Sequence, residues 1–72
     1  MVYFEIKTPQ FGILKLLLNK DITIKNVVQK SLAKLNLDKS TGRLSINGDI
    51  ADENKKLSEY LQPINNAVLI IQ

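Results

Sequence analysis

Residues 43–72 read RLSINGDIADENKKLSEYLQPINNAVLIIQ, and the order of strand and turn signals within them is the strongest indication of architecture in the chain. A short strand pattern at residues 44–46 runs into Asn47-Gly48, a dipeptide typical of tight hairpin turns. A polar segment follows, then a turn-like segment at residues 57–61, and last the apolar strand pattern Ala67–Ile71. This order predicts two strands of one sheet with a polar loop between them.

The N-terminal segment predicts a β-hairpin. Val2–Thr8 alternates apolar and polar side chains with the period of two that is typical of a half-buried strand. Residues 9–12 supply turn chemistry, and residues 13–19 resume strand character. We expect Leu17 to point outward with Lys15, although Leu17 is apolar. The side chains of this second strand that we expect to face the core are Leu14, Leu16 and Leu18.

A helix is predicted after the hairpin. Asp21 or Thr23 offers a side-chain oxygen that can cap the free N–H groups of the first turn. Asn36 is suited to end the helix in the left-handed conformation. Apolar residues recur between these signals at spacings of three and four, which gives one apolar stripe. The stripe consists of Ile24, Val27, Val28, Leu32 and Leu35. The whole pattern predicts an α+β fold, in which a mixed sheet of four to five strands packs on one α-helix.

Composition excludes several classes of protein. The chain has 72 residues, which suffice for one domain, and it contains neither cysteine nor histidine. Disulfides and thiolate metal sites are therefore excluded, and the commonest general base is missing. No apolar run approaches the roughly 20 residues that cross a bilayer, and the N-terminus lacks the basic region of a signal peptide. We therefore expect a protein of the cytosol, the nucleus or both, without a membrane-bound part.

The charged residues predict neither catalysis nor nucleic-acid binding. Asp49, Asp52 and Glu53 share one polar loop, where solvated loop acids are the expected interpretation, and they lack the spacing of a calcium site. We therefore expect no enzyme, no cofactor, no metal and no small-molecule substrate. The net charge of +3 is mild, and the lysines are not interleaved with aromatic residues. A basic face that steers the protein toward an acidic partner is the better interpretation of the lysines.

Several segments resemble the ubiquitin superfamily in the same order along the chain. They are residues 4–8 (FEIKT), 24–27 (IKNV), Arg43-Leu44, Gly48, 57–60 (LSEY) and 68–71 (VLII). The resemblance implies a β-grasp fold over residues 1–72 as one ubiquitin-like domain. It also implies that the hydroxyl of Tyr60 bonds to backbone near residues 51–53.

The same resemblance implies a recognition surface on the open face of the sheet. The positions that correspond to its central apolar patch are Pro9, Ser45 and Ile71, and a serine at the centre implies altered specificity. We expect Phe11, Leu69 and Ile71 to make apolar contacts, Arg43 to supply a charge at the rim, and Gly48 to allow close backbone approach. The expected protein-binding set is Pro9, Phe11, Arg43, Ser45, Gly48, Leu69 and Ile71.

These features predict a non-catalytic interaction module, monomeric in isolation, at the N-terminus of a longer protein. It would dock that protein onto a ubiquitin-pathway protein, a proteasome receptor, a chaperone or an assembly factor. One alternative is a conjugatable modifier, because such proteins end in Gly-Gly and that tail would have to follow Gln72. Another is an assembly module that binds through a sheet edge or through the basic face of the helix.

Overall fold

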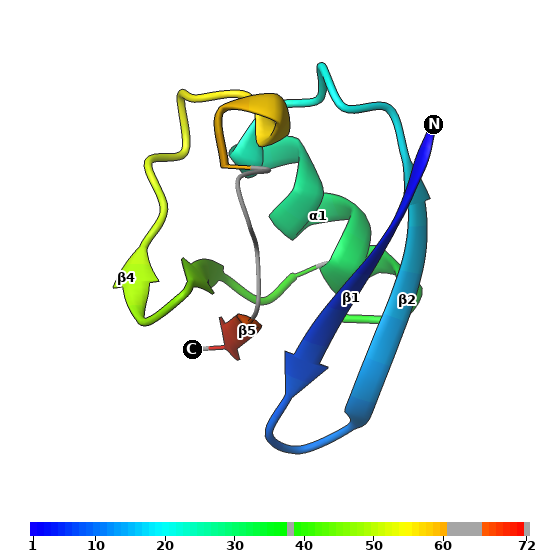
Figure 1. Cartoon of the computed structure of the whole chain (residues 1–72). Helices are drawn as coiled ribbons and strands as arrows, with labels where there is room; N and C mark the ends of the chain where they lie inside the picture. The colour runs from blue at the N-terminus through cyan, green and yellow to red at the C-terminus, as the bar shows by residue number, and fades with distance from the viewer. Residues whose placement is uncertain (38, 61–65, 72) are drawn as a thin grey trace.

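The computed structural model of the chain describes residues 1–37, 39–60 and 66–71. Its elements are β1 (Val2–Thr8), β2 (Gly12–Leu18), α1 (Ile24–Lys34), β3 (Gly42–Ile46), β4 (Asp49–Ile50), the 3-10 helix η1 (Leu57–Tyr60) and β5 (Ala67–Ile71). Figure 1 shows them in sequence colours. Two positions of the sequence predictions, Leu61 and Gln72, lie outside the described residues.

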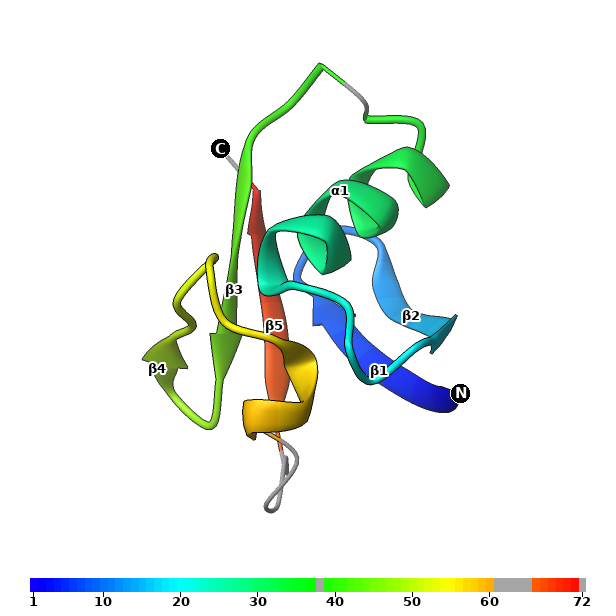
Figure 2. The same cartoon turned by 90° about the horizontal axis from the view of Figure 1, so that it is seen from above.

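The five strands form one mixed sheet in the order β2-β1-β5-β3-β4. The first strand runs parallel to the last, and the other neighbouring pairs are antiparallel. Helix α1 lies across one face of this sheet (Figures 1 and 2). The predicted α+β class, with a mixed sheet packed on one helix, is confirmed. Strand β4 was not predicted individually, because two residues in a polar segment are too few to show a strand period.

The first hairpin has the predicted alternation. Phe4 and Ile6 of β1 are buried, whereas Tyr3, Glu5 and Lys7 are exposed. In β2 the side chains that face the core are Leu14, Leu16 and Leu18, as predicted. The alternation leaves Leu17 on the exposed face, directly opposite Tyr3.

Both ends of α1 follow their sequence signals. Of the two candidate caps, Thr23 is the one used, because its hydroxyl accepts a hydrogen bond from the Asn26 N–H at 3.3 Å. The backbone N–H of Asp21 instead donates to the Asn19 side chain. At the other end Asn36 has a φ of 59°, the predicted left-handed conformation.

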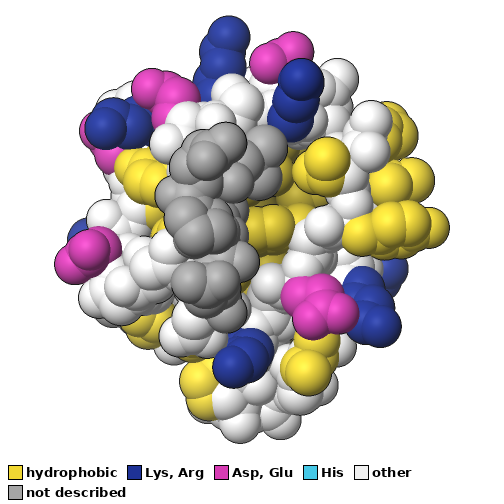
Figure 3. Space-filling view, viewed as in Figure 1, with side chains coloured by type: hydrophobic (Ala, Val, Ile, Leu, Met, Phe, Trp, Pro, Cys, Tyr) yellow, Lys and Arg dark blue, Asp and Glu magenta, His cyan; other side chains and the backbone are white. Residues whose placement is uncertain are grey.

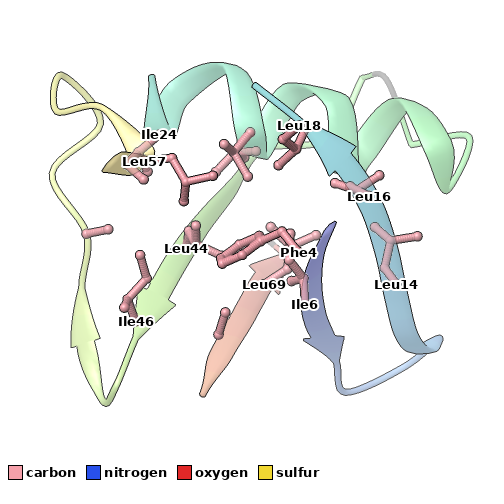
Figure 4. Close-up of a cluster of buried hydrophobic side chains, with 14 of the residues drawn as sticks. Phe4, Ile6, Leu14, Leu16, Leu18, Ile24, Leu44, Ile46, Leu57 and Leu69 are labelled. Atoms are coloured by element: carbon pink, nitrogen blue, oxygen red, sulfur yellow. The ribbon is translucent and has the colours of Figure 1, made fainter. Parts of the chain in front are cut away.

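The hydrophobic core lies between α1 and the sheet. Every strand except β4 contributes to it, and so do the 3-10 helix and the predicted stripe of α1. Leu35, the last residue of that stripe, is only partly buried. Fully buried members from six different segments are Ile6, Leu18, Ile24, Leu44, Leu57 and Leu69 (Figure 4). Within the described part of the chain, no helix is long and apolar enough to cross a membrane.

A tyrosine ties the loop after β4 to the 3-10 helix. The hydroxyl of Tyr60 accepts a hydrogen bond from the Asp52 N–H at 3.0 Å, so the expected contact with residues 51–53 is confirmed. The ammonium group of Lys55 lies 5.9 Å from the centre of the Tyr60 ring. Because Leu57 is buried at the start of the same short helix, the long polar loop is anchored at both a polar and an apolar point.

Candidate protein-binding surface

The face of the sheet opposite α1, called here the open face, carries a continuous cross-strand row of side chains. Lys7 of β1 pairs with Ile13 of β2 on one side and with Val68 of β5 on the other. Val68 pairs with Ser45 of β3, and Ser45 pairs with Ile50 of β4. Because paired residues project to the same face, these five side chains lie next to one another across the whole sheet.

Exposed large hydrophobic side chains are concentrated at this face and its ends. Ile13 is 62% exposed and Ile50 is 53% exposed, and both belong to the row. The pair Tyr3 and Leu17 projects to the same face nearer the N-terminus. The full set among the described residues is Met1, Tyr3, Phe11, Ile13, Leu17, Ile50 and Ile70, and none of them lies on α1. Figure 3 shows hydrophobic side chains gathered over the β1–β2 hairpin, with charged groups between them.

The charges on the open face are mainly positive. Glu5 forms an ion pair with its cross-strand partner Lys15, with 3.7 Å between Nζ and Oε1, and both side chains are well exposed. This pair adds little net charge to the face and little stability. Lys7 and Arg43 remain as cations on either side of β5, because Lys7 pairs with Val68 and Arg43 pairs with Ile70. An acidic partner would therefore be favoured at this face.

The structure brings most of the predicted site residues toward this surface. Pro9 and Phe11 are exposed in the turn between β1 and β2, and Phe11 does not fold back into the core. Arg43 and Ser45 project from β3 to the open face, since their neighbours in the strand alternate with them and Leu44 is buried. Arg43 and Ser45 therefore lie on the expected face, Pro9 and Phe11 are exposed in the adjoining turn, and the role of all four in binding remains a prediction.

Gly48 lies at the edge of this surface rather than on it. It follows Asn47 in the turn between β3 and β4, and it is exposed. Its φ of 92° lies in the region that glycine tolerates best. The predicted tight turn is therefore present, and Gly48 is accessible to a partner from the side of β4.

The placement of Leu69 and Ile71 on the open face is wrong. Leu69 is fully buried and pairs with Leu44, so it faces α1. Ile71 pairs with Gly42, at which a Cβ atom would lie 3.5 Å from the Val28 side chain of α1. Ile71 is accordingly half-buried against the core. The cause is a one-residue error in the register of β5, which moves every side chain of a strand to the opposite face.

The corrected register replaces these two residues by their neighbours. Val68 and Ile70 are the residues of β5 that point to the open face, and Ile50 joins them from β4. Sequence reasoning missed Val68 and Ile70 because residues 67–71 are apolar throughout and show no alternation, and it missed Ile50 because β4 has only two residues. The one available signal was the strand pattern of β3, where the polar residues Arg43 and Ser45 mark the outward positions.

The opposite side of the molecule has a different character. Among the exposed residues of α1 are three lysines, and the sequence of the helix contains no acidic residue. The Nζ of Lys34 reaches the backbone carbonyl of Lys15 at 3.4 Å, over the outer edge of β2. The three lysines of the helix are Lys25, Lys30 and Lys34. This basic face corresponds to the surface of the second alternative interpretation of the sequence.

Two open hollows formed by the described residues do not resemble catalytic sites. The larger, of about 410 Å³, lies between the end of β2 and the start of α1, and no carboxylate lines it. The smaller, of about 200 Å³, lies between α1 and residues 40–42 and has a single carboxylate, Glu53. Acid–base chemistry by two carboxylates needs a pair, which neither hollow contains. Among the described residues no group of three or more acidic side chains is placed to hold a metal ion.

Comparison of the sequence with protein-family models and with curated proteins gave no match. The observed α+β architecture therefore stands on the structure, and the ubiquitin-like resemblance of the sequence remains a prediction.

Proposed function

We propose that this chain is a ubiquitin-like β-grasp domain that acts as a non-catalytic protein-interaction module through the open face. The order of elements supports the fold assignment, because a hairpin, a crossover helix and a return to the sheet place β5 parallel to β1. The Tyr60–Asp52 hydrogen bond, which the family resemblance of the sequence implies, supports it as well.

The observation that carries the functional proposal is the separation of surface types on the two sides of the molecule. Of the exposed large hydrophobic residues of the described chain none belongs to α1, whose exposed face is polar and basic, and only Met1 and Leu17 of them line the hollow beside the start of that helix. Hydrophobic residues that remain in water singly are ordinary, but a group of them on one face marks an interaction surface. The open face is therefore the proposed site of contact with a protein partner.

The chemistry of the open face restricts the partner. Val68 and Ile70 offer apolar contact on the central strand β5, and Ile13 offers it on the edge strand β2. The cations Lys7 and Arg43 lie on the two strands that flank β5. A complementary partner presents an apolar anchor with carboxylates at its rim. Ser45, between Val68 and Ile50 in the row, provides a hydroxyl between two apolar side chains.

Partner capture from a lysate with matched variants tests this proposal. The open-face variant combines Ile13→Ser and Ile70→Ser, which change exposed side chains and leave the core intact. The control variant combines Gln29→Ser and Ala33→Ser on the exposed side of α1. We expect the open-face variant to lose the captured partner, at roughly 1–2 kcal/mol for each anchor, and the control to retain it. Circular dichroism checks that both variants are folded.

Retention of the partner by the folded open-face variant would contradict the proposal. The basic face of α1 is then the second candidate, because the helix has three lysines without an acidic neighbour in its own sequence. Reversal of charge at Lys30 and Lys34 to glutamate would abolish capture in that case. The same reversal has little effect if the open face is the site, apart from slower association with an acidic partner.

A further inference from the structure

The turn between β3 and β4 contains the one Asn-Gly dipeptide of the sequence, Asn47-Gly48. Both residues are exposed, and both have positive φ, 52° for Asn47 and 92° for Gly48. The hairpin that holds them is short, since only two residue pairs join β3 to β4, and β4 is the edge strand of the described sheet. The dipeptide therefore lies at a terminus of the sheet where local opening requires the loss of few interactions.

We propose that Asn47 is a site of spontaneous covalent modification, by deamidation through a cyclic imide. The backbone nitrogen of Gly48 attacks Cγ of Asn47, a new C–N bond forms, and ammonia leaves with the former side-chain nitrogen. Water then opens the imide at one carbonyl or the other, which yields aspartate or isoaspartate. The net reaction consumes one water and releases one ammonia, and it needs no oxidant, reductant or enzyme.

The local structure favours the attack at Gly48. Glycine has no side chain to obstruct the approach of its own nitrogen to the neighbouring Cγ. Around the position that a Cβ atom of Gly48 would take, no atom of the described residues lies within 4 Å. Water reaches the site because both residues are exposed. Asparagine is in general among the residues that limit the chemical lifetime of proteins.

The two hydrogen bonds between Asn47 and Asn66 slow this reaction. The Asn47 N–H donates to the Asn66 carbonyl at 2.7 Å, and the Asn66 N–H donates to the side-chain Oδ1 of Asn47 at 3.1 Å. These bonds hold the carboxamide toward the residue before β5. The side chain has to leave them before its Cγ reaches the nitrogen of Gly48, so the reaction proceeds while the hairpin is open.

The two products have different structural consequences. Aspartate at position 47 keeps an oxygen that can accept from Asn66, tolerates positive φ, and adds one negative charge to the turn that joins Ile46 to Asp49. Isoaspartate adds a methylene group to the backbone inside the turn, which disturbs the adjacent pairing of Ile46 with Asp49. The aspartate product therefore has a β3–β4 hairpin with an additional negative charge, and the isoaspartate product has a disrupted hairpin. This inference does not depend on the proposed function of the open face.

Peptide mapping by mass spectrometry tests the proposal with an internal control. Cleavage after Arg43 and Lys55 releases residues 44–55, a peptide that contains both Asn47 and Asn54. Asn54 is exposed as well but precedes lysine, so it is matched in exposure and differs in its neighbour. The folded chain is incubated at neutral and at mildly alkaline pH, and digestion in heavy-oxygen water marks any deamidation that occurs during sample handling.

We expect Asn47 to show the mass increase that accompanies conversion of its amide to an acid several-fold faster than Asn54 does in the folded chain. The aspartate and isoaspartate forms of the peptide should be separable. The rate should rise with pH, because the attacking amide nitrogen must lose its proton. Gly48→Ala should suppress the reaction, and Asn47→Asp should be folded and show no mass change from deamidation, because it has no side-chain ammonia to lose. The proposal is overturned if Asn47 survives as long as Asn54 in the folded chain. It is equally overturned if Asn47 reacts only in urea, since the Asn66 contacts would then protect it completely.

Discussion

Leu44 of β3 and Leu69 of β5 lie directly opposite each other and are both buried beneath α1. This pair sets the register of the central strands, and through it the side of the sheet to which each residue of β5 points. The neighbouring pair, Arg43 and Ile70, consequently projects to the open face. The composition of the candidate binding surface therefore depends on the position of one leucine in the core.

In β5, truncation of the buried Leu69 should be far more destabilising than truncation of its exposed neighbour Ile70. Leu69→Ala should lower the free energy of unfolding by about 2–5 kcal/mol, because it removes a buried side chain and leaves a cavity. Ile70→Ala should change it by less than about 1 kcal/mol, since the side chain is 37% exposed. Urea denaturation of both variants measures the difference. Equal destabilisation by the two would contradict the register of β5.

Removal of the Tyr60 hydroxyl should have a moderate effect on stability. Tyr60→Phe takes away the acceptor of the Asp52 N–H, and we expect a loss of about 0.5–1.5 kcal/mol. The matched control is Tyr3→Phe, because the Tyr3 side chain is 80% exposed and its loss of a hydroxyl should be neutral. Thermal unfolding of both variants compares them. If the two melt alike, Tyr60 does not anchor the loop after β4 through its hydroxyl.

Loss of the Thr23 cap of α1 should also lower the free energy of unfolding. Thr23→Ala removes the acceptor of the Asn26 N–H at the start of α1, which should destabilise the protein by about 1 kcal/mol. Thr23→Ser keeps the acceptor and should recover most of that loss. Chemical denaturation separates the two, and a serine variant as unstable as the alanine variant would show that packing, not capping, is what Thr23 contributes.

A buried hydroxyl in α1 should prove dispensable. Ser31 is completely buried, and its hydroxyl donates to the Val27 carbonyl at 2.8 Å. The Val27 carbonyl already has a backbone hydrogen-bond donor within the helix, so it does not depend on the Ser31 hydroxyl. Alanine also has a higher helix propensity than serine. Ser31→Ala should therefore change the free energy of unfolding by no more than about 0.5 kcal/mol. A loss as large as that of Leu69→Ala would mean that the hydroxyl is required in the core.

Most of the fold could be predicted because its signals are local. The period of two in β1 identifies its two faces, and Thr23 and Asn36 mark the limits of α1 through capping and left-handed geometry. The dipeptide Asn47-Gly48 marks a hairpin by its tolerance of positive φ. Each of these signals involves only a few neighbouring residues, so it can be recognised without knowledge of any distant segment.

The candidate site could be predicted only in part. Arg43 and Ser45 project to the open face as expected, because the polarity of β3 alternates, and Pro9 and Phe11 are exposed in the turn after β1. Leu69 and Ile71 do not project to that face, and Val68 and Ile70 were missed with them. The family resemblance implied Leu69 and Ile71 as outward residues, and a displacement of one residue along a strand reverses the face to which a side chain points.

The sequence by itself determined the elements other than β4, their order and the inward face of every segment that alternates in polarity, because periodicity and capping are properties of neighbouring residues. Residues 67–71 do not alternate, so their two faces are chemically alike until a partner strand distinguishes them. Only the tertiary structure decided this, by pairing Leu69 with Leu44 under α1 and leaving Val68 and Ile70 in water. The physical reason is that the burial of an apolar strand depends on cross-strand contacts with residues far away in the chain.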